Sequence, residues 1–247
     1  MLPVYIFFGL LALSAVGLWT VGTYFGFWGK SIEKPLCDSQ IRVACIGDSI
    51  TYGMKIPDRR HHCYPADLQK MLGDSYNVRN YGLNNRNAMR ESPFPYNKEK
   101  QFERSLAFCP DIVLLMLGTN DSKKEVWKGK DIWRDDYGNL IDSYQKLPSC
   151  PRIYLLTPAS VYATRQKNGE TGIYANIQDA AIAEICGAIY EIAEERDLTV
   201  IDINTATAGQ RHILNRDGVH PNCEGAVRIA NVIYRRLTGQ TSTSNSL

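Results

Sequence analysis

The sequence lacks an excess of charge of either sign, and it lacks internal repeats. Its 247 residues contain 28 lysine and arginine residues against 26 aspartate and glutamate residues, which gives a formal net charge of +2. Nucleic-acid-binding domains carry a pronounced basic surface, so the even balance excludes nucleic acid as an expected partner. With 44% hydrophobic residues, the chain is long enough for one well-buried domain and an additional segment.

The sequence also lacks the paired ligand spacing of a structural metal site. Its seven cysteines are an odd, scattered set without a disulfide pattern, which fits a reducing environment. The run His61-His62-Cys63 places potential ligands side by side, but zinc sites space their ligands in pairs and no second pair follows. We interpret this run as a solvated loop, and we predict neither a metal nor an organic cofactor.

Charged residues are missing from one long segment, between Leu2 and Trp28. At about 1.5 Å per residue, part of this segment could cross a hydrocarbon core of ~30 Å. It ends in an aromatic cluster that suits a membrane interface, and it lacks the basic leader of a secretory signal. We therefore expect a single-pass membrane anchor over residues 1–29, a linker over 30–40, a domain over 41–238 and a disordered tail over 239–247.

Short apolar runs alternate with helical patterns in the remainder of the chain. Strands are predicted over 41–46, 76–81, 111–117, 152–157 and 198–203. Helices are predicted over 65–72, 132–147, 173–192 and 226–237, from apolar residues that recur at helical spacing. This alternation predicts an α/β fold of three layers, in which helices cover both faces of a parallel sheet.

The first apolar run leads directly into a segment that is rich in turn-forming residues, Gly47-Asp48-Ser49-Ile50-Thr51-Tyr52-Gly53. A serine there lies at the carboxyl end of a strand, where open α/β sheets place their ligands. A serine hydroxyl is a poor nucleophile until a nearby base takes its proton. It also needs hydrogen-bond donors for the oxyanion that forms on the substrate.

Three further segments supply candidates for these roles. Asp217 precedes His220 by three residues in a predicted turn, so its carboxylate can reach one imidazole nitrogen while the other faces Ser49. Asn120 follows the third predicted strand and offers a carboxamide as an oxyanion donor. Gly82 follows the second strand, and its missing Cβ allows its backbone N–H to approach a ligand closely.

Together these four segments resemble the SGNH hydrolases, also called the GDSL esterase and lipase family. The resemblance implies that Ser49 is the nucleophile, that Asp217 and His220 are the acid–base pair, and that an oxyanion hole is formed by Ser49, Gly82 and Asn120. It also implies a flavodoxin-like order of five strands. The Gly-x-Ser-x-Gly elbow of the α/β-hydrolases is missing, which disfavours that fold.

The second of the four segments departs from the usual family pattern Asn-x-Gly-x-x-Gly-x-Thr. Here the second glycine is replaced by Asn85 and the threonine by Asn87. Asparagine tolerates left-handed backbone angles better than most residues, so the loop can be retained with a different width. We predict that Asn85 contacts the substrate.

Two tryptophans and two aspartates near the expected site have alternative interpretations. Trp127 and Trp133 follow the Asn120 segment. They either stack on a sugar ring, with Trp127 as the predicted contact, or pack the following helix onto the sheet. Asp48 and Asp121 are expected to brace their turns through hydrogen bonds.

The expected function is that of a serine esterase that hydrolyses O-acyl esters, with O-acetyl esters as the expected substrates, on a carbohydrate. The sugar preference rests on the likeness to carbohydrate and sialate O-acetylesterase-like members of the family. The alternatives are a lysophospholipase or thioesterase, and a membrane-anchored binding module without catalysis. Basic residues after the anchor favour a cytoplasmic domain, whereas exported relatives favour the other side, so the side of the membrane stays open.

Overall fold

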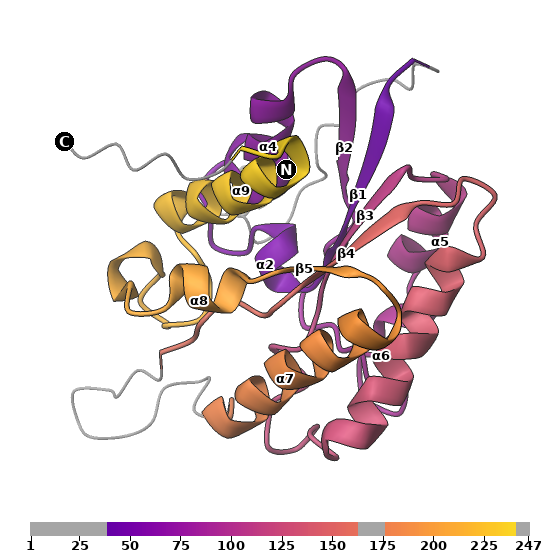
Figure 1. Cartoon of the computed structure of the whole chain (residues 1–247). Helices are drawn as coiled ribbons and strands as arrows, with labels where there is room; N and C mark the ends of the chain where they lie inside the picture. The colour runs from indigo at the N-terminus through magenta and orange to yellow at the C-terminus, as the bar shows by residue number, and fades with distance from the viewer. Residues whose placement is uncertain (1–38, 163–175, 241–247) are drawn as a thin grey trace, which may run out of the picture.

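A five-stranded sheet, parallel throughout, forms the centre of the molecule. The computed structural model describes residues 39–162 and 176–240 (Figure 1). The strand order is β2-β1-β3-β4-β5. This order confirms the predicted flavodoxin-like sheet. The strands are β1 (Ile41–Gly47), β2 (Tyr76–Asn80), β3 (Ile112–Met116), β4 (Arg152–Leu156) and β5 (Thr199–Ile201).

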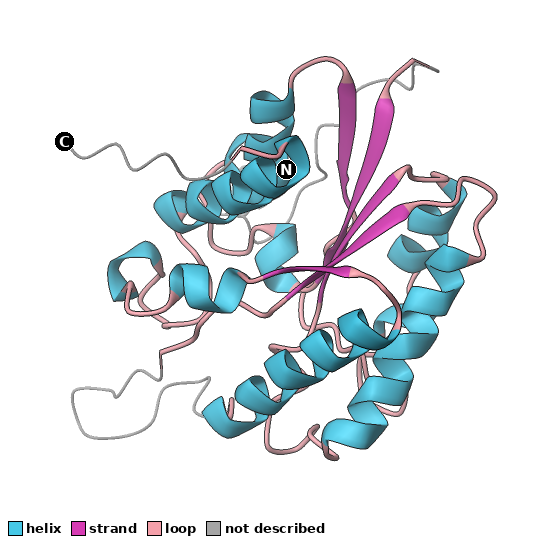
Figure 2. Ribbon diagram, viewed as in Figure 1, coloured by secondary structure: helices cyan, strands magenta, loops and turns pink. Residues whose placement is uncertain are grey.

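Helices cover both faces of this sheet, as the alternation of patterns predicted (Figure 2). On one face lie α4 (Tyr64–Leu72) and α9 (Cys223–Thr238), and on the other lie α5 (Lys100–Ala107), α6 (Lys130–Gln145) and α7 (Asp179–Glu195). Five short helices lie in the connections, namely α2 (Ser49–Tyr52), α3 (Arg59–His62), α8 (Ile203–Thr207), η1 (Tyr96–Lys98) and η2 (Arg211–Ile213). The helix predicted over 173–192 begins later, at Asp179, and Ile177 lies before it.

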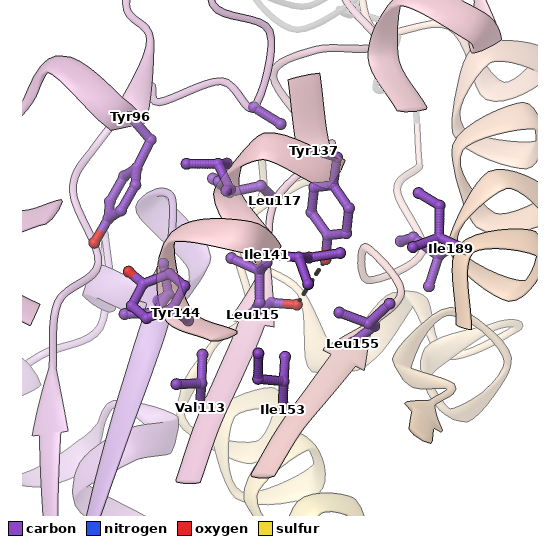
Figure 3. Close-up of a cluster of buried hydrophobic side chains, with 14 of the residues drawn as sticks. Tyr96, Val113, Leu115, Leu117, Tyr137, Ile141, Tyr144, Ile153, Leu155 and Ile189 are labelled. Carbon is purple, nitrogen blue, oxygen red and sulfur yellow. Dashed lines mark hydrogen bonds between the residues drawn. The ribbon is translucent and has the colours of Figure 1, made fainter. Parts of the chain in front are cut away.

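The core consists of two layers of apolar side chains, one on each face of the sheet. Successive residues of a strand point to opposite faces, and β3 shows this directly. Val113 and Leu115 pack toward α6 and α7, whereas Leu114 and Met116 pack toward α4 and α9. Figure 3 shows the first of these layers, in which the Tyr137 hydroxyl donates to the Leu115 carbonyl oxygen at 3.1 Å.

The interpretation of His61-His62-Cys63 as a solvated loop is wrong in two respects. His61 and His62 are exposed, but they lie in α3 rather than in a loop. Cys63 is buried and belongs to the core. The short helix is held by Arg59, whose guanidinium stacks on the Tyr52 ring and donates to the Tyr52 carbonyl oxygen at 2.6 Å.

Several predicted features lie outside the described residues. These are the membrane anchor over 1–29, nearly all of the linker, the tail beyond residue 240, and Ile173. Of the helices in the described ranges, none combines the length and the apolar character needed to cross a bilayer. The anchor and the domain boundaries therefore stay predictions.

Candidate active site

Ser49 begins the short helix α2 immediately after β1 ends. The preceding residue, Asp48, caps this helix, because its Oδ1 accepts a hydrogen bond from the Ile50 backbone N–H at 2.8 Å. Gly53 ends the helix in the left-handed conformation at φ 88°. The tight strand-to-helix connection thus fixes the serine at the carboxyl end of the sheet, where the sequence placed it.

The structure brings Ser49, His220 and Asp217 into one hydrogen-bonded series. His220 Nε2 lies 2.9 Å from Ser49 Oγ, and His220 Nδ1 lies 2.9 Å from Asp217 Oδ2. The other carboxylate oxygen of Asp217 accepts the backbone N–H groups of Val219 and His220 at 2.9 and 3.0 Å. The spacing of three residues therefore folds the carboxylate back onto the imidazole, as predicted. The side chains are shielded from solvent, with Ser49 7% and His220 3% exposed.

A lysine that the sequence patterns did not reveal also contacts the aspartate. Lys55 Nζ lies 2.5 Å from Asp217 Oδ2, the same oxygen that faces His220. Burial alone would raise the pKa of Asp217, but the hydrogen bonds from His220 and Lys55 outweigh it and hold the pKa well below its usual value. Asp217 is therefore ionised throughout the neutral pH range.

A pocket of about 190 Å³ opens in front of Ser49. Predicted site residues that line it are Asn85, Asn120 and His220, together with Ser49 itself. Its apolar part is formed by Met54, Ile177 and Val219, none of which the sequence analysis assigned to the site. Within residues 39–162 and 176–240, no group of three histidine, cysteine, aspartate or glutamate side chains could hold a metal ion.

The Asn120 carboxamide is held at the wall of this pocket by two hydrogen bonds. Its Nδ2 donates to the Arg86 carbonyl oxygen at 3.2 Å and to Asp48 Oδ2 at 3.4 Å. Both bonds are longer than the usual N–H···O distance of about 2.9–3.0 Å. An anionic oxygen in the pocket can therefore compete for this donor.

The structure does not place the Gly82 N–H, which was predicted to be an oxyanion donor, at the pocket. That N–H donates to Asn80 Oδ1 at 2.9 Å, and Gly82 is not among the residues that line the pocket. The glycine is needed for packing instead, because a Cβ there would lie 2.3 Å from the Tyr52 backbone nitrogen in α2. Asn80 also connects the end of β2 to α2, since its Nδ2 donates to the Thr51 carbonyl oxygen at 2.8 Å.

Asn85, rather than Gly82, lies in the pocket where the sequence analysis expected a backbone oxyanion donor. Its φ is +64°, so the asparagine takes the left-handed conformation that was anticipated for it. It lines the pocket beside Ser49 and Asn120. Its backbone N–H has no hydrogen-bond partner among the described residues, and it is therefore available to a ligand.

The two tryptophans differ in their surroundings. Trp133 is fully buried and stacks on Tyr137, with ring centroids 4.5 Å apart. It therefore packs α6 onto the sheet and cannot stack on a sugar. Trp127 is partly buried against the same core layer and is not among the residues that line the pocket, so its contact with a substrate stays a prediction.

Two buried carboxyl groups flank the site. Asp48 braces its own turn, as predicted. Asp121 instead braces a distant loop, because its Oδ1 accepts the Met89 backbone N–H at 2.8 Å. Burial raises the pKa of Asp48 to about 6 and that of Asp121 to about 7, although hydrogen bonds from backbone N–H groups act in the opposite direction.

We expect Asp121→Asn to flatten the dependence of stability on pH. The folded state raises the pKa of Asp121 above its ordinary value of 3.8, so the stabilisation is complete below about pH 4 and is lost as the pH rises through about 7. Asparagine keeps the oxygen that accepts the Met89 N–H but cannot ionise. At pH 8 the free energy of unfolding of the variant should exceed that of the unaltered protein by on the order of 2 kcal/mol.

Urea unfolding of both proteins at pH 4, 6 and 8 measures this difference. The exposed Asp135 provides a control, since Asp135→Asn should leave the pH dependence as it is. If the free energy of unfolding changes with pH as steeply in Asp121→Asn as in the unaltered protein, the expectation is contradicted. Asp48 still contributes a smaller change of the same sign in both proteins.

Comparisons with known proteins give the chain's relatives. Residues 45–228 match the GDSL-like lipase/acylhydrolase family. An acetylxylan esterase from Xylanibacter ruminicola is 36% identical over 226 residues, which cover 84% of this chain and 45% of that protein. The chain thus spans about half the length of this curated relative.

Solved structures share the fold at low sequence identity. The carbohydrate acetylesterase Est24 from Sinorhizobium meliloti superposes with a TM-score of 0.66 at 18% identity, covering 82% of this chain and 100% of Est24. The native aryl esterase of M. smegmatis gives a TM-score of 0.65 at 17% identity, covering 81% of this chain and 99% of the esterase. At these identities the likeness shows a common fold.

Proposed function

The chain belongs to the GDSL-like lipase/acylhydrolase family, a family of carboxylic ester hydrolases, and we propose that it is a serine esterase that removes acetyl groups from a carbohydrate. The observation that carries the proposal is the hydrogen-bonded series of Ser49, His220 and Asp217, with both distances at 2.9 Å. These distances are within the reach that proton transfer requires.

In the proposed reaction Ser49 Oγ attacks the ester carbonyl carbon while His220 Nε2 takes the hydroxyl proton. Asp217 orients the imidazole through Nδ1 and stabilises the imidazolium that forms. Lys55 contributes by holding Asp217 ionised. The bond from the acyl carbon to the sugar oxygen then breaks as His220 protonates that oxygen, so the sugar leaves with a hydroxyl group and an acetyl-enzyme remains. The same imidazole activates the water that releases acetate.

The negative oxygen of the tetrahedral intermediate needs several donors aimed at one point. We assign this role to the backbone N–H groups of Ser49 and Asn85 and to the side chain of Asn120. Asn85 replaces Gly82 in this set, because the Gly82 N–H is already donated to Asn80. Removing one such donor typically costs 10²–10³-fold in kcat.

The preference for acetyl is supported by the size of the pocket and by the relative. A volume of about 190 Å³ is below the ~300–1,000 Å³ of pockets that enclose larger ligands. Its apolar lining by Met54, Ile177 and Val219 suits a methyl group. The carbohydrate is proposed from the likeness to the acetylxylan esterase.

Acyl chain length therefore provides the test of the proposal. The protein from residue 41 onward is assayed with p-nitrophenyl esters of increasing acyl length. We expect kcat/KM to fall by at least about tenfold from acetate to octanoate, because a long acyl group cannot enter the pocket. Acetate release from acetylated xylo-oligosaccharides should be detectable alongside. Hydrolysis that favours long chains, with no action on acetylated sugars, would support a lysophospholipase or thioesterase and overturn our assignment.

A further inference from the structure

We propose that Lys123 is a positioning residue that holds Asn85 in its left-handed conformation, so that the Asn85 backbone N–H points at the oxyanion. This inference rests on the proposed function and deepens it. It concerns the position at which this chain departs from the family pattern, where an asparagine takes the place of the second glycine.

The backbone conformation at residue 85 requires an explanation because a left-handed conformation has a steric cost for asparagine. A φ of +64° is open to glycine without a steric penalty, whereas a residue with a Cβ adopts it at a cost. Asparagine lowers this cost only when its side chain finds suitable hydrogen bonds. The conformation of this loop therefore depends on what the Asn85 side chain contacts.

The contact is a short hydrogen bond from a cation. Lys123 Nζ donates to Asn85 Oδ1 at 2.6 Å. Hydrogen bonds from an ionised donor are shorter and about twice as strong as neutral ones. Burial lowers the pKa of Lys123, against the effect of Glu125, Asp48 and Asp121, and the half-buried ammonium needs a partner to offset its lost hydration.

Lys123 is itself fixed relative to the other donors of the site. It follows Asn120 by three residues, and its backbone N–H donates to the Asn120 carbonyl oxygen at 3.3 Å. It also forms an antiparallel bridge with Ile177, which lines the pocket. One side chain thus connects the segment of Asn120 to the segment of Asn85, and it sets the distance between two oxyanion donors.

The experiment compares the effect of Lys123→Met in two backgrounds, Asn85 and Asn85→Gly. In the Asn85 background we expect kcat for p-nitrophenyl acetate to fall by about 10–30-fold with KM changed by less than about threefold. A misplaced donor stabilises the transition state less well but leaves substrate binding nearly unchanged. In the Asn85→Gly background the same substitution should cost less than about threefold, because glycine takes a positive φ without a clamp. Lys123→Arg, which retains a donor, should lose less than Lys123→Met.

The controls separate positioning from charge and from folding. Lys124 is exposed, so Lys124→Met removes the same charge one residue away and should leave kcat within about twofold. Thermal unfolding checks that each variant is folded. Equal losses on Lys123→Met in the two backgrounds would overturn the inference, because a direct charge effect does not depend on residue 85. An Asn85→Gly enzyme too slow to measure would overturn it as well.

The proposed function is tested separately in the same assay. If the unaltered protein shows no hydrolysis that depends on Ser49, the function itself is wrong. If hydrolysis depends on Ser49 but Lys123→Met has no effect, only the inference about Lys123 is wrong.

Discussion

Replacing Ser49 by alanine is expected to lower kcat for p-nitrophenyl acetate by about 10⁴-fold or more. The variant keeps the oxyanion donors and the pocket but has no oxygen 2.9 Å from His220 Nε2 to attack the carbonyl carbon. The triad acts as one unit, so His220→Ala should cost about as much and the double variant little more. Initial rates at saturating substrate measure the effect.

Folding should be unaffected, which makes the result specific. Alanine differs from Ser49 only by the loss of one hydroxyl oxygen, so the midpoint of thermal unfolding should change by no more than a few degrees. Ser143→Ala provides a control, since that hydroxyl donates to the Asn139 carbonyl oxygen within α6, away from the pocket. Rates for Ser49→Ala within tenfold of the unaltered protein would leave only a non-catalytic binding module as an explanation.

Gly82→Ala is expected to lower the rate of hydrolysis by about 10²-fold and to destabilise the fold at the same time. An added Cβ would lie 2.3 Å from the Tyr52 nitrogen and 2.6 Å from the Thr51 carbonyl carbon, both of them backbone atoms of α2. Neither atom can move aside without displacing Ser49 from its position opposite His220. Overpacking of this kind costs about 1–3 kcal/mol, and a displacement of about 1 Å at the nucleophile costs about 10²-fold in rate.

The matched control is another glycine to which a methyl group can be added freely. At Gly187, within α7, nothing lies within 4 Å of an added Cβ. Gly187→Ala should retain activity and gain up to about 1 kcal/mol in helix stability. Circular dichroism melting and esterase rates of the two variants give the comparison. An active, fully stable Gly82→Ala protein would show that the two segments are not in this close contact.

The sequence was sufficient to predict the sheet and the proximity of Ser49, His220 and Asp217, for physical reasons that can be named. Strands buried on both faces are near-continuous apolar runs, so β1 and β3 stand out. The proximity could be predicted because Asp217 and His220 are close in the chain and Ser49 follows a strand. Helix α5 was missed because only Phe102 and Leu106 of its eight residues are apolar contacts of the core.

The remainder of the site depends on contacts that no local pattern encodes. Lys55 and Ile177 reach the site from loops, and the sequence analysis assigned Ile177 to a helix and Lys55 to no pattern. Gly82 was predicted to bring its backbone N–H close to a ligand. In the structure the glycine lies against α2 and its N–H donates to Asn80, so we assign the donor role to Asn85 in the proposed function.

The packing of α9 against α4 has a consequence for the way in which the proposed activity would be acquired. Ser49, the proposed nucleophile, follows β1, whereas His220, its proposed base, lies 171 residues later and shortly before α9. A nascent or truncated polypeptide that ends before His220 holds a serine without this proton acceptor, and we expect it to hydrolyse no ester. On the proposed function, the recovery of hydrolysis during refolding therefore measures when the segment of His220 and α9 reaches Ser49.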